Sequence, residues 1–312
     1  MTALTIPKPA NRLAWLRERH SYFNASDVAC LFGAHPHRDL ADVVADKLAP
    51  DVTDDGETEA MDRGNRLEPV LLDWLGDRLG VQMVTPDVLH VNGCLMATLD
   101  GEPVGDTDTW AEAKSTREYW DDVPGHVYWQ MVGQAAASGR AEGWCVWIDA
   151  DLRFKHAKVT PHPDHIADVL SRAEQFMCFI ELGMTPEGVE MRAEHVAQMF
   201  PAPEVGKWAT VDEVGRDAIA AWDEARLERI AAEKRERALK DEVANLLLDA
   251  EGAKFNGIPI ATWRRNKPSD RFVVGKHAAD APDCHAAHTI EVPGPRVLRS
   301  TKELRTFQGV TA

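Results

Sequence analysis

The sequence predicts a mixed α/β domain, in which helices flank a central sheet, followed by a helical C-terminal extension. Within residues 1–200, apolar residues recur at helical spacing in some stretches and form short runs of strand length in others. The order is helices, a strand cluster, a helix, two strands and a closing helix, which is typical of a sheet covered by helices. Beyond residue 200 the chain becomes strongly charged, so we place a domain boundary there, with the extension at 201–312.

The first part of the domain is expected to be mainly helical. The segment 24–33 has Asn24 or Ser26 as a candidate N-cap and Gly33 as a candidate end. The segment 50–58, which holds a proline, a glycine and several acids, is expected to be an exposed loop. Helices are predicted at 12–19, 24–33, about 39–48 and 59–80.

The middle of the domain supplies the predicted sheet. The stretch 107–115 alternates polar and small apolar residues, as a half-buried strand does. The stretches 142–150 and 152–159 flank a turn at Asp149–Asp151 and are expected to pair with each other as strands. Two helices complete the domain, at about 124–138 and at 162–182. The remaining strands are predicted at 81–85, 87–92 and 94–99.

The extension has three predicted parts. Residues 212–250 are expected to form a long charged helix. Asn256 and Gly257 form a strong turn signal, which predicts a hairpin over about 254–265. The remainder of the chain is polar and irregular in pattern, so we expect a loosely packed tail.

The bulk composition limits the class of protein. Hydrophobic residues make up 44% of the 312 residues, which is enough for a substantial core. No apolar run approaches the ~18 residues of a membrane span, and the first residues do not resemble a secretory signal. We therefore expect a cytoplasmic protein without a membrane partner. The five cysteines are widely spaced and form no C-x-x-C pair, which argues against a disulfide scaffold and against a clustered zinc or iron–sulfur site.

The net charge of −16 is unfavourable for binding nucleic acid. Phosphate backbones are attracted by clustered Lys and Arg and are repelled by an acidic surface. Because salt screens charges beyond ~10 Å at ordinary ionic strength, the total charge still allows a locally basic groove. The charge therefore disfavours tight non-specific binding to DNA without excluding a DNA enzyme.

One set of polar residues has a spacing that suits phosphodiester hydrolysis. Asp100 ends an apolar strand candidate. Glu112 and Lys114 lie two residues apart on the strand candidate 107–115, so both point to one face of the sheet. Two carboxylates that converge at one edge can bind Mg²⁺, with the carbonyl of Ala113 as a further oxygen ligand. Lys114 beside the metal would orient or deprotonate the attacking water and offset the charge that develops on the phosphate.

Several short motifs follow one another in a matching order that makes residues 12–150 similar to a known family. They are RERHSYFNASDVACLFG (17–33), DRGNRLEPVLLDWL (62–75), TLDG (98–101), AEAK (111–114), VYWQMVGQAAASG (127–139) and GWCVWIDAD (143–151). Together they resemble the YqaJ-type viral recombinase domain, a branch of the lambda-exonuclease-like nucleases. The resemblance implies a PD-(D/E)XK restriction-endonuclease-like core for the α/β domain.

The resemblance also implies roles for residues around the motif. Asp100 and Glu112 would be metal ligands together with the Ala113 carbonyl, and Lys114 would be the catalytic lysine. Glu68, on the preceding helix, would be an additional catalytic acid close to the metals or the water.

Four further residues receive roles in the same way. Gln130 would lie against the catalytic lysine and the substrate, and Gln134, one helical turn on, would share its face and contact substrate. Ser26 resembles the serine that holds a terminal 5′ phosphate in this family, and Arg19 resembles the arginine that accompanies it.

The resemblance implies a metal-dependent DNA exonuclease that uses Mg²⁺ or Mn²⁺. It would degrade one strand of linear duplex DNA, 5′ to 3′, and prepare single strands for phage-type homologous recombination. Its partners would be duplex DNA with a free end and a single-strand annealing recombinase, in the cytoplasm of a bacterial host. Related enzymes form rings, so a homo-oligomer is expected.

Two alternatives remain open from the sequence. The first is a structure-specific or Cas4-like endonuclease, and the lack of clustered cysteines counts against its iron–sulfur form. The second is a catalytically idle module that binds DNA ends. The intact set of Asp100, Glu112 and Lys114 argues against such an idle module, since a site that no longer performs catalysis tends to lose such residues.

Overall fold

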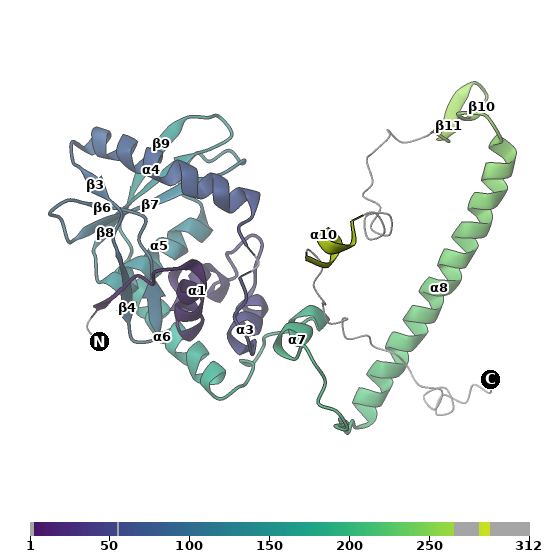
Figure 1. Cartoon of the computed structure of the whole chain (residues 1–312), viewed down its shortest axis with the longest axis horizontal. Coiled ribbons are helices and arrows are strands. Elements are labelled where there is room, and N and C mark those ends of the chain that lie inside the picture. The colour runs from purple at the N-terminus through teal and green to yellow at the C-terminus, as the bar shows by residue number, and fades with distance from the viewer. Residues whose placement is uncertain (1–2, 55, 265–280, 288–312) are drawn as a thin grey trace. The chain divides into compact units, whose positions relative to one another are not determined.

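The computed structural model describes residues 3–54, 56–264 and 281–287. Most of the predicted irregular tail therefore lies outside the described residues. Contacts between residues divide the chain into two compact units (Figure 1), an N-terminal unit of Met1–Ala202 and a C-terminal unit of Pro203–Ala312.

The N-terminal unit contains two main sheets. In the first, β1 (Leu4–Pro7), β4 (Val88–Asn92), β5 (Leu95–Ala97) and β2 (Phe23–Asn24) lie in the order β1-β4-β5-β2. In the second, β7 (Thr109–Ser115) pairs in parallel with β8 (Glu142–Ile148), which pairs antiparallel with β9 (Phe154–Val159). A two-stranded sheet joins β3 (Met83–Val84) to β6 (Glu102–Pro103).

Helices cover these sheets, which confirms the predicted mixed α/β architecture (Figure 1). Five of the described helices fall within two residues of the predicted ranges at each end. They are α1 (Arg12–Ser21), α3 (Leu40–Leu48), α4 (Glu59–Leu79), α5 (Gly125–Ser138) and α6 (Pro163–Glu181). Strand β1 and helix α7 (Ala193–Met199) were not predicted.

The predicted helix over 24–33 was wrong in extent. The segment instead holds the end of β2, a 3₁₀ turn η1 (Ala25–Asp27) and a single turn of helix α2 (Val28–Leu31). Asn24 is not a side-chain cap, because its amide donates to the carbonyl of Arg19 and to Asp27 Oδ2. The reason is tertiary: Phe23 and Asn24 pair with β5, which holds the start of the segment extended.

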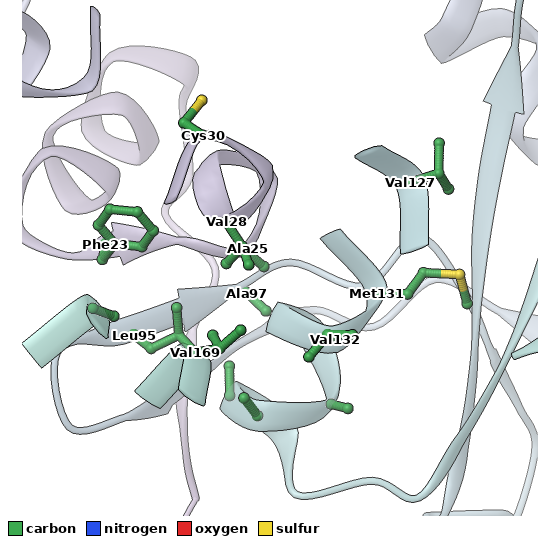
Figure 2. Packing of buried hydrophobic residues seen from close by; sticks show 14 of the residues in the cluster. Phe23, Ala25, Val28, Cys30, Leu95, Ala97, Val127, Met131, Val132 and Val169 are labelled. Atoms are coloured by element: carbon green, nitrogen blue, oxygen red, sulfur yellow. The ribbon is translucent and has the colours of Figure 1, made fainter. Parts of the chain in front are cut away.

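Helix α5 lies at the centre of the main hydrophobic core. Figure 2 shows Val127, Met131 and Val132 of this helix in the same cluster as Phe23 and Leu95, and all five are fully buried. Since α5 is buried along most of its length, its polar side chains must find partners inside the protein. Two of these are the glutamines of the predicted site.

The C-terminal unit is built on the 35-residue helix α8 (Glu213–Leu247). A hairpin of β10 (Gly252–Phe255) and β11 (Ile258–Thr262) follows it. Its turn is Asn256–Gly257, where both residues have positive φ, as a tight hairpin turn requires. A short helix α10 (Pro282–Ala287) ends the described residues. In this described part of the chain, no helix is both long and apolar enough to cross a membrane.

Charge is divided unequally along the sequence. Residues 1–202 contain 17 Lys and Arg and 33 Asp and Glu, whereas residues 203–312 contain 18 of each kind. The whole net charge of −16 therefore belongs to the N-terminal unit.

Candidate active site

A cleft of about 370 Å³ in the N-terminal unit brings together the residues that the sequence singled out. Its lining comes from α1, η1, α4, β7, α5 and the segment that follows β5. All nine predicted site residues line it: Arg19, Ser26, Glu68, Asp100, Glu112, Ala113, Lys114, Gln130 and Gln134.

Strand β7 carries the central pair of the cleft. Glu112 and Lys114 alternate onto the same face, as predicted, and Lys114 Nζ lies 2.5 Å from Glu112 Oε1. The carboxylate of Glu112 is 1% exposed, while the lysine side chain is 29% exposed toward the cleft. Since β7 is paired with β8 along its whole length, this ion pair rests on a rigid strand.

Asp100 reaches the same place from a different segment. It follows β5 by three residues, and the next residue, Gly101, forms a two-way backbone bridge with Ala111 of β7. This bridge places the aspartate so that its Oδ2 accepts the backbone N–H of Ala113 at 2.9 Å. Gly101 also allows α4 to pack closely, because a Cβ there would lie 2.6 Å from a methyl carbon of Leu72.

Three carboxylates face one another in the cleft. Burial and, after it, the charge of Glu112 raise the pKa of Asp100 well above its usual value, and the same two causes raise the pKa of Glu68. Burial lowers the pKa of Lys114, but Glu112 and Asp100 outweigh it, so the net pKa lies above its usual value. Lys114 is therefore protonated at neutral pH, and its single charge only partly offsets the three acids.

This donor set fits a divalent cation. Hard oxygen ligands from carboxylates are what Mg²⁺ and Mn²⁺ prefer. A cation among Asp100, Glu112 and Glu68 would relieve the repulsion that raises the pKa of two of them. The role of the Ala113 carbonyl remains a prediction, since the contact that the structure gives for this residue is through its N–H.

Both glutamines of α5 hold the carboxylate of Glu112. Gln130 Nε2 donates to Glu112 Oε1 at 2.5 Å, and Gln134 Nε2 donates to Glu112 Oε2. Gln134 is only 1% exposed, so the geometry favours a role in fixing Glu112 over the predicted contact with substrate. Gln130 meets the lysine indirectly, because Lys114 contacts the same carboxylate oxygen.

Arg19 and Ser26 form a second polar group in the cleft. Arg19 Nη2 donates to Ser26 Oγ at 2.8 Å, and the guanidinium lies over the ring of Trp15 at 4.6 Å. Lys47 fixes the backbone here by donating its Nζ to the carbonyl of Arg19 at 2.6 Å. The sequence analysis identified neither Trp15 nor Lys47. Lys47 lies on α3, which meets α1 only through the tertiary fold, whereas Trp15 lies four residues before Arg19 on α1, a helical spacing that could have indicated their contact.

A separate group of possible metal ligands already has a cation. Asp39, Asp42 and His195 approach one another between α3 and α7. The guanidinium of Arg192 lies 2.5 Å from Asp39 Oδ2 and 2.8 Å from Asp42 Oδ1, and it also contacts His195. We therefore interpret this group as an ion-paired contact between two helices.

The fold and the cleft define a mixed α/β domain in which an Asp, two Glu and a Lys converge beside an Arg–Ser pair. Residues 14–141 match the family described as the YqaJ-like viral recombinase domain. This match covers less than half of the chain and agrees with the family that the motifs of the sequence resemble.

Solved structures with a similar arrangement are distant from this chain. An alkaline exonuclease from Laribacter hongkongensis has 19% identity and a TM-score of 0.44, and the match covers 54% of this chain and 92% of that one. A phage-related exonuclease from Haemophilus somnus 129PT has 11% identity and a TM-score of 0.42, with 52% and 94% covered. No curated protein matches the chain. The similarity to the family therefore rests on the match over residues 14–141.

Proposed function

We propose that this chain is a metal-dependent DNA exonuclease that degrades one strand of linear duplex DNA in the 5′-to-3′ direction. The observation that carries the proposal is the convergence of Asp100, Glu112 and Lys114 in a cleft that also contains the Arg19–Ser26 pair. The product would be single strands for phage-type homologous recombination. We assign this activity to residues 1–200, which contain all the proposed site residues.

Asp100 and Glu112, with the carbonyl of Ala113, would hold Mg²⁺ or Mn²⁺, and Glu68 would lie close to the metal as an additional catalytic acid. When bound, the metal would supply a Lewis acid and an activated water for attack on phosphorus. Gln130 and Gln134 hold Glu112 in one orientation, so its carboxylate is fixed before any ligand arrives. This arrangement avoids the cost of ordering the carboxylate during the reaction.

Lys114 is the cation that pairs with Glu112 among the carboxylates of the cleft. Because its pKa is raised, it is protonated and donates hydrogen bonds at neutral pH. It is well suited to orient the attacking water or to stabilise the negative charge that builds up on the phosphate oxygens. Protonation argues against Lys114 as the base, and we assign the role of acceptor of the water proton to Glu68, a carboxylate that lines the same cleft.

The Arg19–Ser26 pair supports recognition of a 5′ terminal phosphate. A guanidinium and a hydroxyl that already lie 2.8 Å apart can both donate to phosphate oxygens. Stacking on Trp15 and the short contact from Lys47 limit the motion of Arg19. Binding of the terminal phosphate at this point would set which strand enters the catalytic part of the cleft.

Digestion of linear duplex DNA tests the proposal. The substrates carry 5′-phosphate or 5′-hydroxyl ends, with Mg²⁺ or EDTA, and a closed circle serves as a control. We expect metal-dependent loss of the linear DNA, fastest from phosphorylated ends, with the circle intact. Cleavage of the circle would favour an endonuclease, and no cleavage of either with Mg²⁺ or Mn²⁺ would favour a DNA-end-binding module.

The proposal extends to partners. The enzyme would act in the cytoplasm of a bacterial host, as a homo-oligomer such as a ring, together with a single-strand annealing recombinase. Sedimentation velocity of the full chain tests the oligomeric state, since a monomer at micromolar concentration would contradict a stable ring.

A further inference from the structure

The side-chain amide of Gln134 is held from both ends inside the protein. Its Nε2 donates to Glu112 Oε2 and to the carbonyl of Thr98 at 3.2 Å. Its Oε1 accepts from the indole Nε1 of Trp110 at 2.9 Å. Gln134, Glu112 and Trp110 are all buried, so water does not compete strongly for these contacts.

These partners determine which way round the amide lies. The indole N–H of Trp110 can only donate, whereas the Thr98 carbonyl and the Glu112 carboxylate can only accept. If the amide rotated by half a turn, its oxygen would face the carboxylate and its nitrogen would face the indole N–H. Each contact would then be repulsive or lost, so the indole and the two acceptors select the same orientation.

The position of Trp110 is itself fixed by the sheet. It lies on β7 two residues before Glu112, so both side chains point to the face that α5 covers. The register of the parallel pair places Gly143 of β8 beside it. A Cβ at Gly143 would lie 2.6 Å from the indole ring and 2.7 Å from the terminal methyl of Met131. The glycine thus leaves the space that the indole occupies.

We propose that Trp110 is a positioning residue for the active site. It fixes the amide of Gln134 so that the amide donates to Glu112, and this contact holds the carboxylate in the orientation that receives the metal. Trp110 acts through Gln134 and contacts neither metal nor substrate. The metal-related part rests on the proposed function, whereas the fixing of the amide does not.

The first test measures the amide directly. In Trp110→Phe, hydrogen exchange of the Gln134 side-chain NH₂, followed by NMR, is expected to become at least about 10-fold faster, because the indole donor that selects the amide orientation is gone. Replacing Trp110 by 3-benzothienylalanine removes the N–H while keeping the ring size, so it serves if the smaller phenyl ring prevents folding. Exchange within about two-fold of the wild type in the benzothienyl variant would overturn the proposal.

The second test measures binding of Mn²⁺ alone by calorimetry. Loss of an outer partner of a metal ligand typically weakens metal affinity about 10- to 100-fold, and we expect a loss in this range for Trp110→Phe. In a Gln134→Met background, Trp110→Phe should weaken binding no further, since its effect passes through that amide. A further tenfold loss there would contradict action through Gln134.

Trp147→Phe is the matched control. Trp147 is also buried in the same core and lies on the neighbouring strand β8, but its indole nitrogen has no hydrogen-bond partner among the described residues. This variant should leave both readouts unchanged, and an equal effect would overturn the specific role of Trp110. If Glu112→Gln leaves the affinity for Mn²⁺ unchanged, the proposed metal site fails, and the exchange measurement still decides whether Trp110 fixes the amide.

Discussion

Replacement of Lys114 by methionine separates the chemical from the structural role of the lysine. The change keeps most of the side-chain volume and removes the charge that lies 2.5 Å from Glu112 Oε1. If Lys114 stabilises charge on the phosphate, the loss should resemble that of other preorganised donors, about 10²- to 10³-fold in rate, or about 2.7–4 kcal/mol.

The expected effect on stability is smaller than for a fully buried pair. Removal of one partner of a buried ion pair costs about 3–5 kcal/mol. Here the side chain of Lys114 is 29% exposed, and Glu112 keeps the donors Gln130 and Gln134. We therefore expect a loss of about 1–3 kcal/mol, the range for a buried donor or acceptor that loses its hydrogen-bond partner. Each kcal/mol corresponds to about 2–4 °C in melting temperature for a domain of this size.

The chain offers a closely matched control in Lys155→Met. Lys155 Nζ lies 2.6 Å from Asp149 Oδ2 on the same sheet, and the two side chains are 26% and 0% exposed. The assay is single-turnover degradation of 5′-phosphorylated linear duplex in saturating Mg²⁺, with thermal unfolding of each variant. We expect both variants to melt at lower temperature and only Lys114→Met to lose rate. Retention of more than a tenth of the rate in Lys114→Met, or an equal loss in Lys155→Met, would refute the reasoning.

Three further predictions concern the acids and the phosphate pair. Ser26→Ala should reduce the preference for 5′-phosphorylated over 5′-hydroxyl ends by about 10- to 100-fold, the value of one charge-assisted hydrogen bond of about 1.5–3 kcal/mol; an unchanged ratio of initial rates would contradict it. Asp100→Asn should raise the melting temperature in EDTA, because it removes a charge that burial and Glu112 disfavour, and should abolish stabilisation by Mg²⁺; a lower melting temperature in EDTA counts against this. Since the pKa values of Asp100 and Glu68 are raised above their usual 3.8 and 4.5 in the folded protein, these groups cost stability as pH rises through the folded values. The difference in melting temperature between Asp100→Asn and wild type in EDTA should therefore grow from about pH 4 upward, and a constant difference would show that the pKa of Asp100 is not raised.

The sequence predicted strand β7, which carries Glu112 and Lys114, because the alternation that indicates a strand is a local pattern. Alternation along 107–115 places Glu112 and Lys114 on one face regardless of what the strand packs against. Helix α5 could be predicted from the sequence in the same way, since its apolar spacing and the glycine that ends it are local signals. Periodicity alone does not predict which distant residues meet. The resemblance to family motifs supplied that long-range information, and in the structure the nine predicted site residues line one cleft.

The features that the sequence did not predict depend on pairing between distant segments. Strand β1 contains a proline and is short, and it exists because Leu4–Pro7 pairs with β4 at the sheet edge. The segment 24–33 has the composition of a capped helix, but pairing of Phe23 with Leu95 holds its start extended. The contact of Trp110 with Gln134 likewise joins residues 24 positions apart. A local pattern gives no signal for such a pair, although the strand alternation places Trp110 on the same face as Glu112.

Because the whole net negative charge lies in residues 1–202, it would affect how the proposed exonuclease meets DNA. At about 0.01 M salt the Debye length is about 30 Å, so DNA approaching the cleft would feel the acids of the entire surface. At about 0.15 M it falls to about 8 Å, and the local cations of the cleft then dominate at close range. Salt weakens the binding of DNA to most DNA-binding proteins. Here we expect moderate salt to increase the rate of association with DNA, until the salt also screens the charges of Arg19 and Lys114.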